Sequence, residues 1–200
     1  ADTLNYSNRD TLEQSKFPWY EFHDGMTVNE AELVANGIKL DDSGNGGNIT
    51  GNATMIPKVS IDSVVVSFNT DPKFDTLARA LTYITDDQSQ SNFYRRLLNY
   101  ASLDSLPEQD FLVTDRFSQT ALIAFGTGFN LVEGDTMFNT IFHISEDYYN
   151  YSESVQLAVI GNLNPFAQPS PIKSNVRGTG NPLGIFTCLV YDRDTTIVKR

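Results

Sequence analysis

The stretch DTMFNTIFHIS, residues 135–145, is an apolar run of strand length with polar residues at both ends. Four further runs of this kind lie in the second half of the chain: TALIAFGTG (120–128), ESVQLAVIGN (153–162), LGIFTCLVYD (183–192) and TTIVKR (195–200). They are bounded by Gly, Asn, Asp or Pro, and their spacing suits antiparallel pairing. The second half of the chain is therefore predicted to consist of antiparallel strands.

An earlier segment, KVSIDSVVVSFN at residues 58–69, also has the pattern of a strand. Val64, Val66 and Phe68 alternate with smaller or polar residues at the strand period of two. The parity changes between Ile61 and Val64, which indicates a bulge or an early twist. We therefore expect a strand here with an irregularity near its start.

Between these strand regions, residues 71–106 have the pattern of two helices joined by the polar link TDDQSQS. Asp71 is placed as an N-cap and Pro72 as a first helical residue, before apolar residues at three and four spacing up to Ile84. A second periodic stretch begins at Phe93, and Pro107 closes it. This pattern predicts a helical hairpin inserted between strands.

The predicted fold class is mainly β, an antiparallel β-sandwich or jelly-roll-like fold with this two-helix insertion at about residues 71–106. An α+β fold with an open antiparallel sheet is the alternative. The chain of 200 residues is long enough to bury a proper core in one domain. We expect residues 38–200 to form that domain and residues 1–37 to form an N-terminal arm.

The arm contains an aromatic anchor, in the segment KFPWYEFHDG. Trp19, Tyr20 and Phe22 offer a large apolar area outside any periodic element, and Pro18 disfavours a helix there. These three residues are predicted to contact another subunit. Tyr191, in the C-terminal β segment, is the fourth predicted interface residue, because a terminal strand can complete a neighbour's sheet.

The formal net charge of −11 narrows the classes of partner. A field of this sign repels a phosphate backbone and an anionic membrane, so we expect no direct contact with nucleic acid. No stretch approaches the length of about 18 apolar residues that a membrane helix needs, so membrane insertion is not expected either. The start at Ala1 fits a mature secreted protein or a chain that lost its initiator Met.

The glycine-rich stretch LDDSGNGGNITGN, residues 40–52, matches the first half of a calcium-binding loop. Asp41, Ser43, Asn45 and Gly46 stand where such a loop needs ligands and a sharp turn. The bidentate Glu that completes the loop is replaced by Asn52. The stretch is therefore interpreted as a flexible hairpin tip.

A second candidate site is the segment SEDYYNYSES, residues 145–154, which combines aromatic rings and carboxylates. Such a combination is typical of surfaces that bind a sugar or a protein. The candidate ligand-binding residues are Glu146, Asp147, Tyr148, Tyr149 and Tyr151. The simpler interpretation is a polar loop between two strands, with one ring folded back on the core.

No catalytic, metal or cofactor site is predicted. His23 and His143 are the two histidines, and neither lies beside a recognisable nucleophile. Zinc would need His or Cys clusters that the sequence lacks, and the close glycines do not open a helix as a phosphate loop requires. Pairs of carboxylates for glycoside hydrolysis remain open, because their separation is spatial.

The leading functional hypothesis is a non-enzymatic structural subunit of an ordered assembly, either a virion protein (capsid, decoration or tail) or an extracellular filament subunit. Its expected partners are copies of itself and other assembly subunits, and its expected location is the virion or the extracellular space. The alternatives are a secreted carbohydrate-binding module and a glycoside-acting enzyme. The acidic charge implies that self-association tightens with salt.

Overall fold

The structure is a computed structural model that describes residues 13–14, 20–21, 38–42, 49–118, 120–162 and 170–200. The chain divides into two compact units. Unit 1 comprises residues 1–55 and 150–188, and unit 2 comprises residues 56–149 and 189–200. The predicted division into an arm over residues 1–37 and one domain over residues 38–200 stays a prediction, because most of the arm lies outside the described residues.

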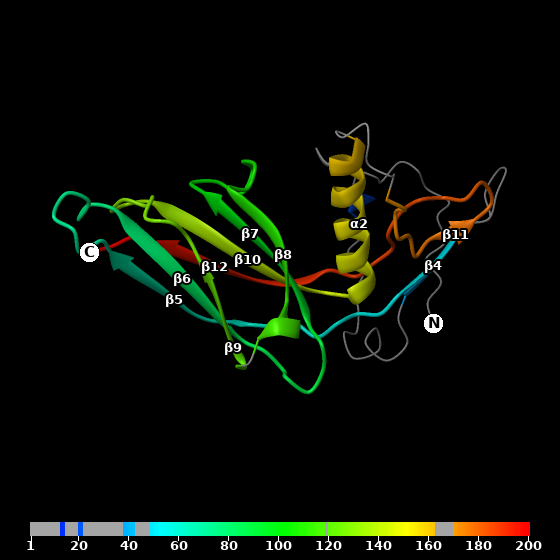
Figure 1. The fold of residues 1–200 in the computed structure, drawn as a ribbon, viewed down its shortest axis with the longest axis horizontal. Coiled ribbons are helices and arrows are strands. Elements are labelled where there is room, and N and C mark those ends of the chain that lie inside the picture. The colour runs from blue at the N-terminus through cyan, green and yellow to red at the C-terminus, as the bar shows by residue number, and fades with distance from the viewer. Residues whose placement is uncertain (1–12, 15–19, 22–37, 43–48, 119, 163–169) are drawn as a thin grey trace. The chain divides into compact units, whose positions relative to one another are not determined.

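Unit 2 is formed by two antiparallel sheets (Figure 1). One has the order β12-β10-β7-β8, with β7 at Phe93–Tyr100, β8 at Gln109–Thr114, β10 at Thr136–Ile144 and β12 at Val190–Ile197. The other has the order β5-β6-β9, with β5 at Ile61–Phe68, β6 at Ala78–Thr85 and β9 at Leu122–Gly126. The predicted mainly β, antiparallel fold class is confirmed.

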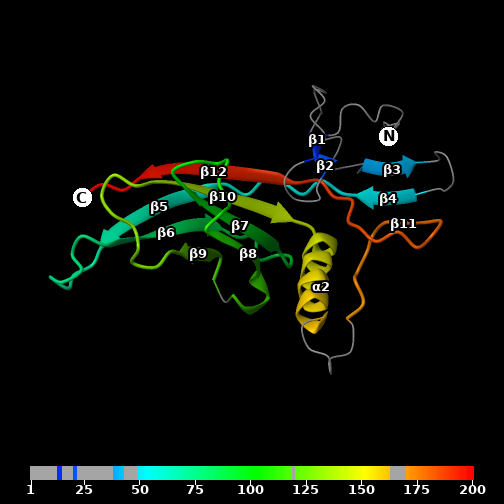
Figure 2. The ribbon, with the colours of Figure 1, turned by 90° about the horizontal axis from the view of Figure 1, so that it is seen from above.

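The strands of the two sheets lie side by side in Figure 2. Their buried residues form two shared clusters, as expected of a sandwich. Ala78 and Ala80 of β6 are fully buried in one cluster with Leu98 of β7 and Met137 of β10. A second cluster joins Ile84, Tyr94, Phe125 and Ile141, again from both sheets. Because successive side chains of a strand point to opposite faces, the alternate residues of β10 and β12 form an outer face.

The two-helix insertion is wrong, because the segments expected to be helical are the strands β6 and β7. In β6 the buried residues alternate strictly, from Ala78 to Ile84, with more exposed ones between them. Apolar residues in ARALTYIT satisfy both the helical and the strand period, and its Thr, Tyr and Ile content favours a strand. Asp71 caps a turn instead of a helix, since its Oδ1 accepts the Lys73 N–H at 2.9 Å.

The helix of the described chain is α2, Glu146–Asn162 (Figure 1). It replaces both the expected polar loop at residues 145–154 and the expected strand at residues 153–162, which are wrong. The Ser145 hydroxyl accepts the Tyr148 N–H at 3.2 Å, and two acidic residues fill the first turn. A serine cap followed by acidic residues is a helix start signal, and a short apolar run alone does not separate helix from strand.

Other sequence expectations have mixed outcomes. The strand at residues 58–69 is β5, and its register shifts between Ile61 and Ser63, which confirms the irregularity. The runs at 120–128 and 135–145 are β9 and β10. The run at 183–192 is a strand only from Val190 onward, within β12.

Unit 1 contains a small antiparallel sheet of order β11-β4-β3. Its strands are β3 at Ile38–Asp42, β4 at Ile49–Ala53 and β11 at Arg177–Gly178. Two short strands, β1 at Glu13–Gln14 and β2 at Tyr20–Glu21, also pair with one another. The pair β3–β4 flanks the glycine-rich tip, whose residues 43–48 lie outside the described part.

Phe186 is held close to β4 in unit 1. The side chain of Asn175 both accepts the Phe186 N–H and donates to the Phe186 carbonyl, at 2.8 Å each. A Cβ at Gly51 would lie 3.0 Å from the Phe186 Cβ. Glycine at this position therefore allows the phenylalanine to approach the strand.

Candidate functional site

Two connections between the sheets meet at one end of unit 2. Residues 86–92 join β6 to β7, and residues 115–121, which begin with the 3₁₀ helix η2 at Asp115–Phe117, join β8 to β9. Phe93 pairs with Thr114 and Thr85 with Leu122, so the register places both connections at the same end.

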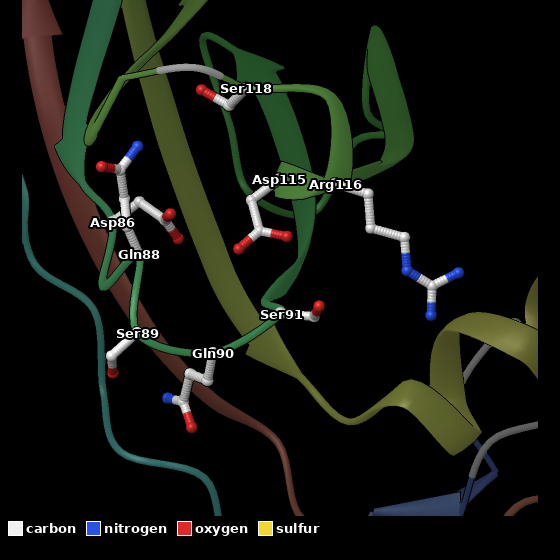
Figure 3. Close-up of a pocket in the computed structure, with 8 residues that line it drawn as sticks. All are labelled: Asp86, Gln88, Ser89, Gln90, Ser91, Asp115, Arg116 and Ser118. Carbon is white, nitrogen blue, oxygen red and sulfur yellow. The ribbon is translucent and has the colours of Figure 1, made fainter.

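The two connections line a pocket of about 330 Å³, the loop-end pocket (Figure 3). Its lining is polar, and it consists of Asp86, Gln88, Ser89, Gln90, Ser91, Asp115, Arg116 and Ser118. Loops on a rigid sandwich are a usual place for a binding site.

Asn92 holds two buried carboxylates at the base of this pocket. Its side-chain amide donates to Asp86 Oδ1 at 3.0 Å, and its backbone N–H donates to Asp115 Oδ2 at 2.8 Å. The same amide also donates to the Asp87 carbonyl at 2.7 Å. These contacts fix the orientation of the amide, so both carboxylates are arranged as hydrogen-bond acceptors.

His143 and Tyr94 lie behind Asn92. His143 Nδ1 is 2.7 Å from the Pro57 carbonyl and Nε2 is 3.2 Å from Asn92 Oδ1. Both oxygens are acceptors, so a ring N–H can donate to either of them. The Tyr94 ring stacks on His143 at 5.2 Å, and its hydroxyl donates to Asp86 Oδ1. Burial and the Asp86 carboxylate raise the pKa of Tyr94 above its ordinary value, so the hydroxyl stays a donor.

Asp115 keeps one carboxylate oxygen without a partner. The residue is only 9% exposed, and its Oδ1 is buried with no hydrogen bond from any described residue. Across the described ranges, neither Asp86 nor Asp115 forms an ion pair with Lys or Arg. The nearby Arg116 binds Glu146 at 2.6 Å instead, and Figure 3 shows its side chain directed away from Asp115. The pocket can therefore accept hydrogen bonds or bind a cation.

The predicted tyrosine and carboxylate cluster is distributed over the first turns of α2. Tyr148 is 1% exposed and its hydroxyl accepts from Arg95 at 2.6 Å, so one ring does fold back on the core as interpreted. The Tyr149 ring lies 5.0 Å from the ring of Phe93. The Tyr148 ring is therefore buried, whereas Tyr149 is half-buried.

The remaining members of this cluster are not brought together into one pocket. Glu146 is bound to Arg116, Asp147 is exposed and Tyr151 is half-buried further along the helix. None of the five residues lines the loop-end pocket. Their role in ligand binding stays a prediction.

The predicted interface residue Tyr191 lies on the outer face of the four-stranded sheet. It is 47% exposed, and its ring packs 5.4 Å from the ring of Phe142, its directly paired neighbour on β10. The Arg193 guanidinium lies 5.0 Å from the centre of the Tyr191 ring and is fixed by a bond from its Nε to the Thr140 hydroxyl at 2.9 Å. Tyr191, Phe142 and Arg193 thus form an ordered patch, the outer-face patch.

The other predicted interface residues are not tested by the structure. Trp19 and Phe22 lie outside the described residues, and for Tyr20 only its backbone place in β2 is described. Their role as an anchor stays a prediction.

The residues of the loop-end pocket were missed in the sequence. Asp86, Gln88, Gln90 and Asn92 stand at alternate positions of one connection, which is a pattern of oxygen-bearing side chains. The sequence pattern predicts a link between two helices here, and this prediction does not place these residues beside Asp115. Identification of β6 and β7 as strands would have placed it at an end of the sandwich.

Among the described residues, no helix has the length and apolar character required to cross a membrane. Within the same residues, no group of three or more His, Cys, Asp or Glu side chains is placed to hold a metal ion.

The fold and the pocket define a β-sandwich protein with a polar, acidic pocket between its loops. The chain belongs to the family described as Domain of unknown function (DUF4249), whose model matches residues 22–195. No curated protein and no solved structure matches the chain.

Proposed function

We propose that the protein is a non-catalytic structural subunit that associates with copies of itself through the outer-face patch. The observation that carries the proposal is the exposure of ordered aromatic and apolar side chains on the side of the sheet away from the core. Tyr191 is 47% exposed and Ile197 on the same strand is 50% exposed. Both alternate with residues that face inward, so the sandwich leaves them on its surface.

The composition of the patch supports a role in protein binding. Tyrosine and arginine are enriched among the residues that contribute most to interface affinity, and rigid stacked rings lose little entropy on binding. Among the described residues, Arg193 forms no ion pair, while the chain carries a net charge of −11. Another copy therefore offers an acidic surface to this unpaired cation.

The outer face of the four-stranded sheet is better suited to contact another copy than the edge of that sheet is. β12 is the edge strand, but Asp192 and Asp194 alternate with the outward residues and so point toward the core side. Inward charged residues on an edge strand oppose pairing with another chain. Asp192 also accepts the Ile61 N–H at 2.8 Å, which ties this part of the edge to β5. We therefore infer contact through side chains of the sheet face rather than the strand addition that the sequence predicts.

The test is the solution mass of the protein and of Tyr191→Ala, measured by light scattering. The wild-type protein should form particles larger than its 22.3 kDa chain, and the variant should shift strongly toward the monomer. Phe129→Ala is the matched control, because Phe129 is also an exposed aromatic residue, at 40%, but lies in the connection from β9 to β10. A monomeric wild-type protein, or equal loss in both variants, would contradict the proposal.

The kind of assembly to which the subunit belongs is proposed from the amino-acid composition alone. A virion protein or an extracellular filament subunit remains the prediction for the kind of assembly. The carbohydrate-binding alternative loses the Tyr148 ring as a stacking surface, because that ring is buried. The glycoside-acting alternative, which depends on paired carboxylates, stays a prediction.

A further inference from the structure

We propose that the loop-end pocket binds a divalent cation of the calcium type, with Asp86 and Asp115 as its charged ligands. This site is separate from the outer-face patch, so the inference is independent of the proposed function. It rests on the charges, the burial and the chemistry of the pocket lining.

The first argument is an excess of negative charge at the base of the pocket. Asp86 is 3% exposed and Asp115 is 9% exposed, and neither has a lysine or arginine partner among the described residues. Arg116 also lines the pocket, but its guanidinium binds Glu146 at 2.6 Å. Buried charges are costly unless they are paired or bind a metal ion.

The second argument is the unpartnered oxygen of Asp115. Its Oδ1 is buried and accepts no hydrogen bond from a described residue, while Oδ2 is already occupied by the Asn92 N–H. In Figure 3 the Asp115 carboxylate points into the space enclosed by the two connections, and the Asp86 carboxylate extends toward the same space. An oxygen held in this way lacks the partner that a buried acceptor needs.

The third argument is the chemistry of the lining. Besides the two carboxylates, it contains the side-chain amides of Gln88 and Gln90, several serine hydroxyls and Arg116, whose guanidinium binds Glu146, and it has no sulfur or imidazole ligand. Oxygen ligands without sulfur or imidazole select hard cations. Calcium accepts carboxylate, carbonyl, hydroxyl and water oxygens in flexible geometry, so two carboxylates are sufficient when neutral oxygens and water complete the shell. The connection also carries Asp86, Gln88 and Gln90 at alternate positions, as calcium loops do.

The test is calorimetric titration of the full chain with CaCl₂, alongside the variants Asp115→Asn and Asp41→Asn. We expect a Kd of about 0.1–1 mM, weakened by roughly tenfold or more in Asp115→Asn. Asp41→Asn is the matched control, because it removes a carboxylate from the glycine-rich stretch at residues 40–52, at the end of β3 and outside the loop-end pocket lining. If Asp41→Asn abolishes binding and Asp115→Asn keeps it, the proposal is wrong.

Tb³⁺ luminescence supplies a second measurement, because its intensity depends on how close the bound ion is to a tyrosine. Tb³⁺ occupies calcium sites and emits when a nearby tyrosine is excited, and the Tyr94 hydroxyl is bonded to Asp86. Tyr94→Phe should lower the emission by more than it lowers Tb³⁺ affinity. Equal emission in Tyr94→Phe and in the wild-type protein would place the ion elsewhere and overturn the assignment.

Two further outcomes would overturn the proposal. No heat with Ca²⁺ at millimolar concentration in the wild-type protein would overturn it, and so would a thermal shift produced by spermidine but not by Ca²⁺. Asp86→Asn repeats the test if Asp115→Asn does not fold. Tyr191→Ala should keep full calcium binding, so failure of this inference is distinguishable from failure of the proposed function.

Discussion

At the scale of single residues, Arg96 has the most demanding environment in unit 2. Its side chain is fully buried, and its guanidinium carbon lies 5.9 and 6.0 Å from the ring centres of Phe111 and Phe125. No carboxylate of a described residue forms an ion pair with it. Its guanidinium donates to Gln109 and Asn139 at 2.6 and 2.7 Å. Burial lowers the pKa of Arg96 to about 10, which still leaves the group charged at neutral pH. The charge is thus held by neutral acceptors and ring faces.

Replacement of Arg96 should lower the free energy of unfolding, and more so the larger the cavity that the new side chain leaves. Arg96→Ala should lower the free energy of unfolding by about 3 kcal/mol or more, because it opens a cavity and leaves the two amide acceptors unpaired. Arg96→Met refills part of the space and should lose about 1–2 kcal/mol less than Ala. Chemical denaturation followed by circular dichroism measures both changes.

A surface arginine supplies the control for this comparison. Arg200 is paired with Asp75 at 3.3 Å at an exposed position, so Arg200→Ala should change stability by about 1 kcal/mol or less. An Arg96→Ala protein as stable as the Arg200→Ala protein would contradict the role of Arg96 in the core.

At the scale of elements, Asp192 links the edge strand β12 to the start of β5. It accepts the Ile61 N–H at 2.8 Å and pairs with Lys58 at 2.9 Å. Burial opposes its ionisation, but the Ile61 N–H and the Lys58 ammonium outweigh this effect and hold the pKa of Asp192 below its ordinary value. The two sheets are therefore joined here by a contact that needs the ionised carboxylate.

Because of this contact, the stability of the fold should depend on pH. A carboxyl group whose pKa is lower in the folded state adds stability above its unfolded pKa of about 3.9, and the added stability is lost as the pH falls through the folded pKa. Asp192→Asn should thus lower the free energy of unfolding by about 1 kcal/mol at pH 7, a value reduced because Asp192 is partly exposed. Below the folded pKa of Asp192, the substitution should change the free energy of unfolding by almost nothing. Thermal melts over this pH range measure the difference.

A carboxylate without such contacts checks this prediction. Asp104 lies exposed in the connection between β7 and β8, and Asp104→Asn should follow the wild-type melting curve at every pH. An equal loss for Asp192→Asn at pH 7 and below the folded pKa would mean that packing, rather than charge, is responsible.

The strands of unit 2 differ in how well the sequence alone predicts them. The alternation around Val64, Val66 and Phe68 predicts β5 and its irregularity, because a strand with one buried face must alternate. ARALTYIT has apolar residues that fit both periods, and only the partner strands β5 and β9 decide between them. The loop-end pocket depends on that decision, because Asp86 and Asp115 are brought to Asn92 by the register of four strands.

At the scale of the whole molecule, the net charge of −11 opposes the contact that the outer-face patch favours. Every copy repels every other copy through this field, whereas Arg193 contributes one local attraction of about 0–1 kcal/mol. The repulsion acts over roughly 30 Å at 0.01 M salt and about 8 Å at 0.15 M. Added salt therefore weakens the repulsion between copies while it leaves the aromatic contact in place. The aromatic part of the patch does not depend on charge and persists.

Self-association should therefore strengthen as salt is added. Light scattering at about 0.01 M and about 0.15 M NaCl should give a higher average mass at the higher salt, because screening shortens the repulsion. Tyr191→Ala should remain near the monomer mass at both concentrations, since screening cannot restore the lost ring contact with another copy. A wild-type mass that falls with salt would mean that ion pairs such as those of Arg193 dominate the contact. A mass that is unchanged and monomeric would remove the case for self-assembly through this face.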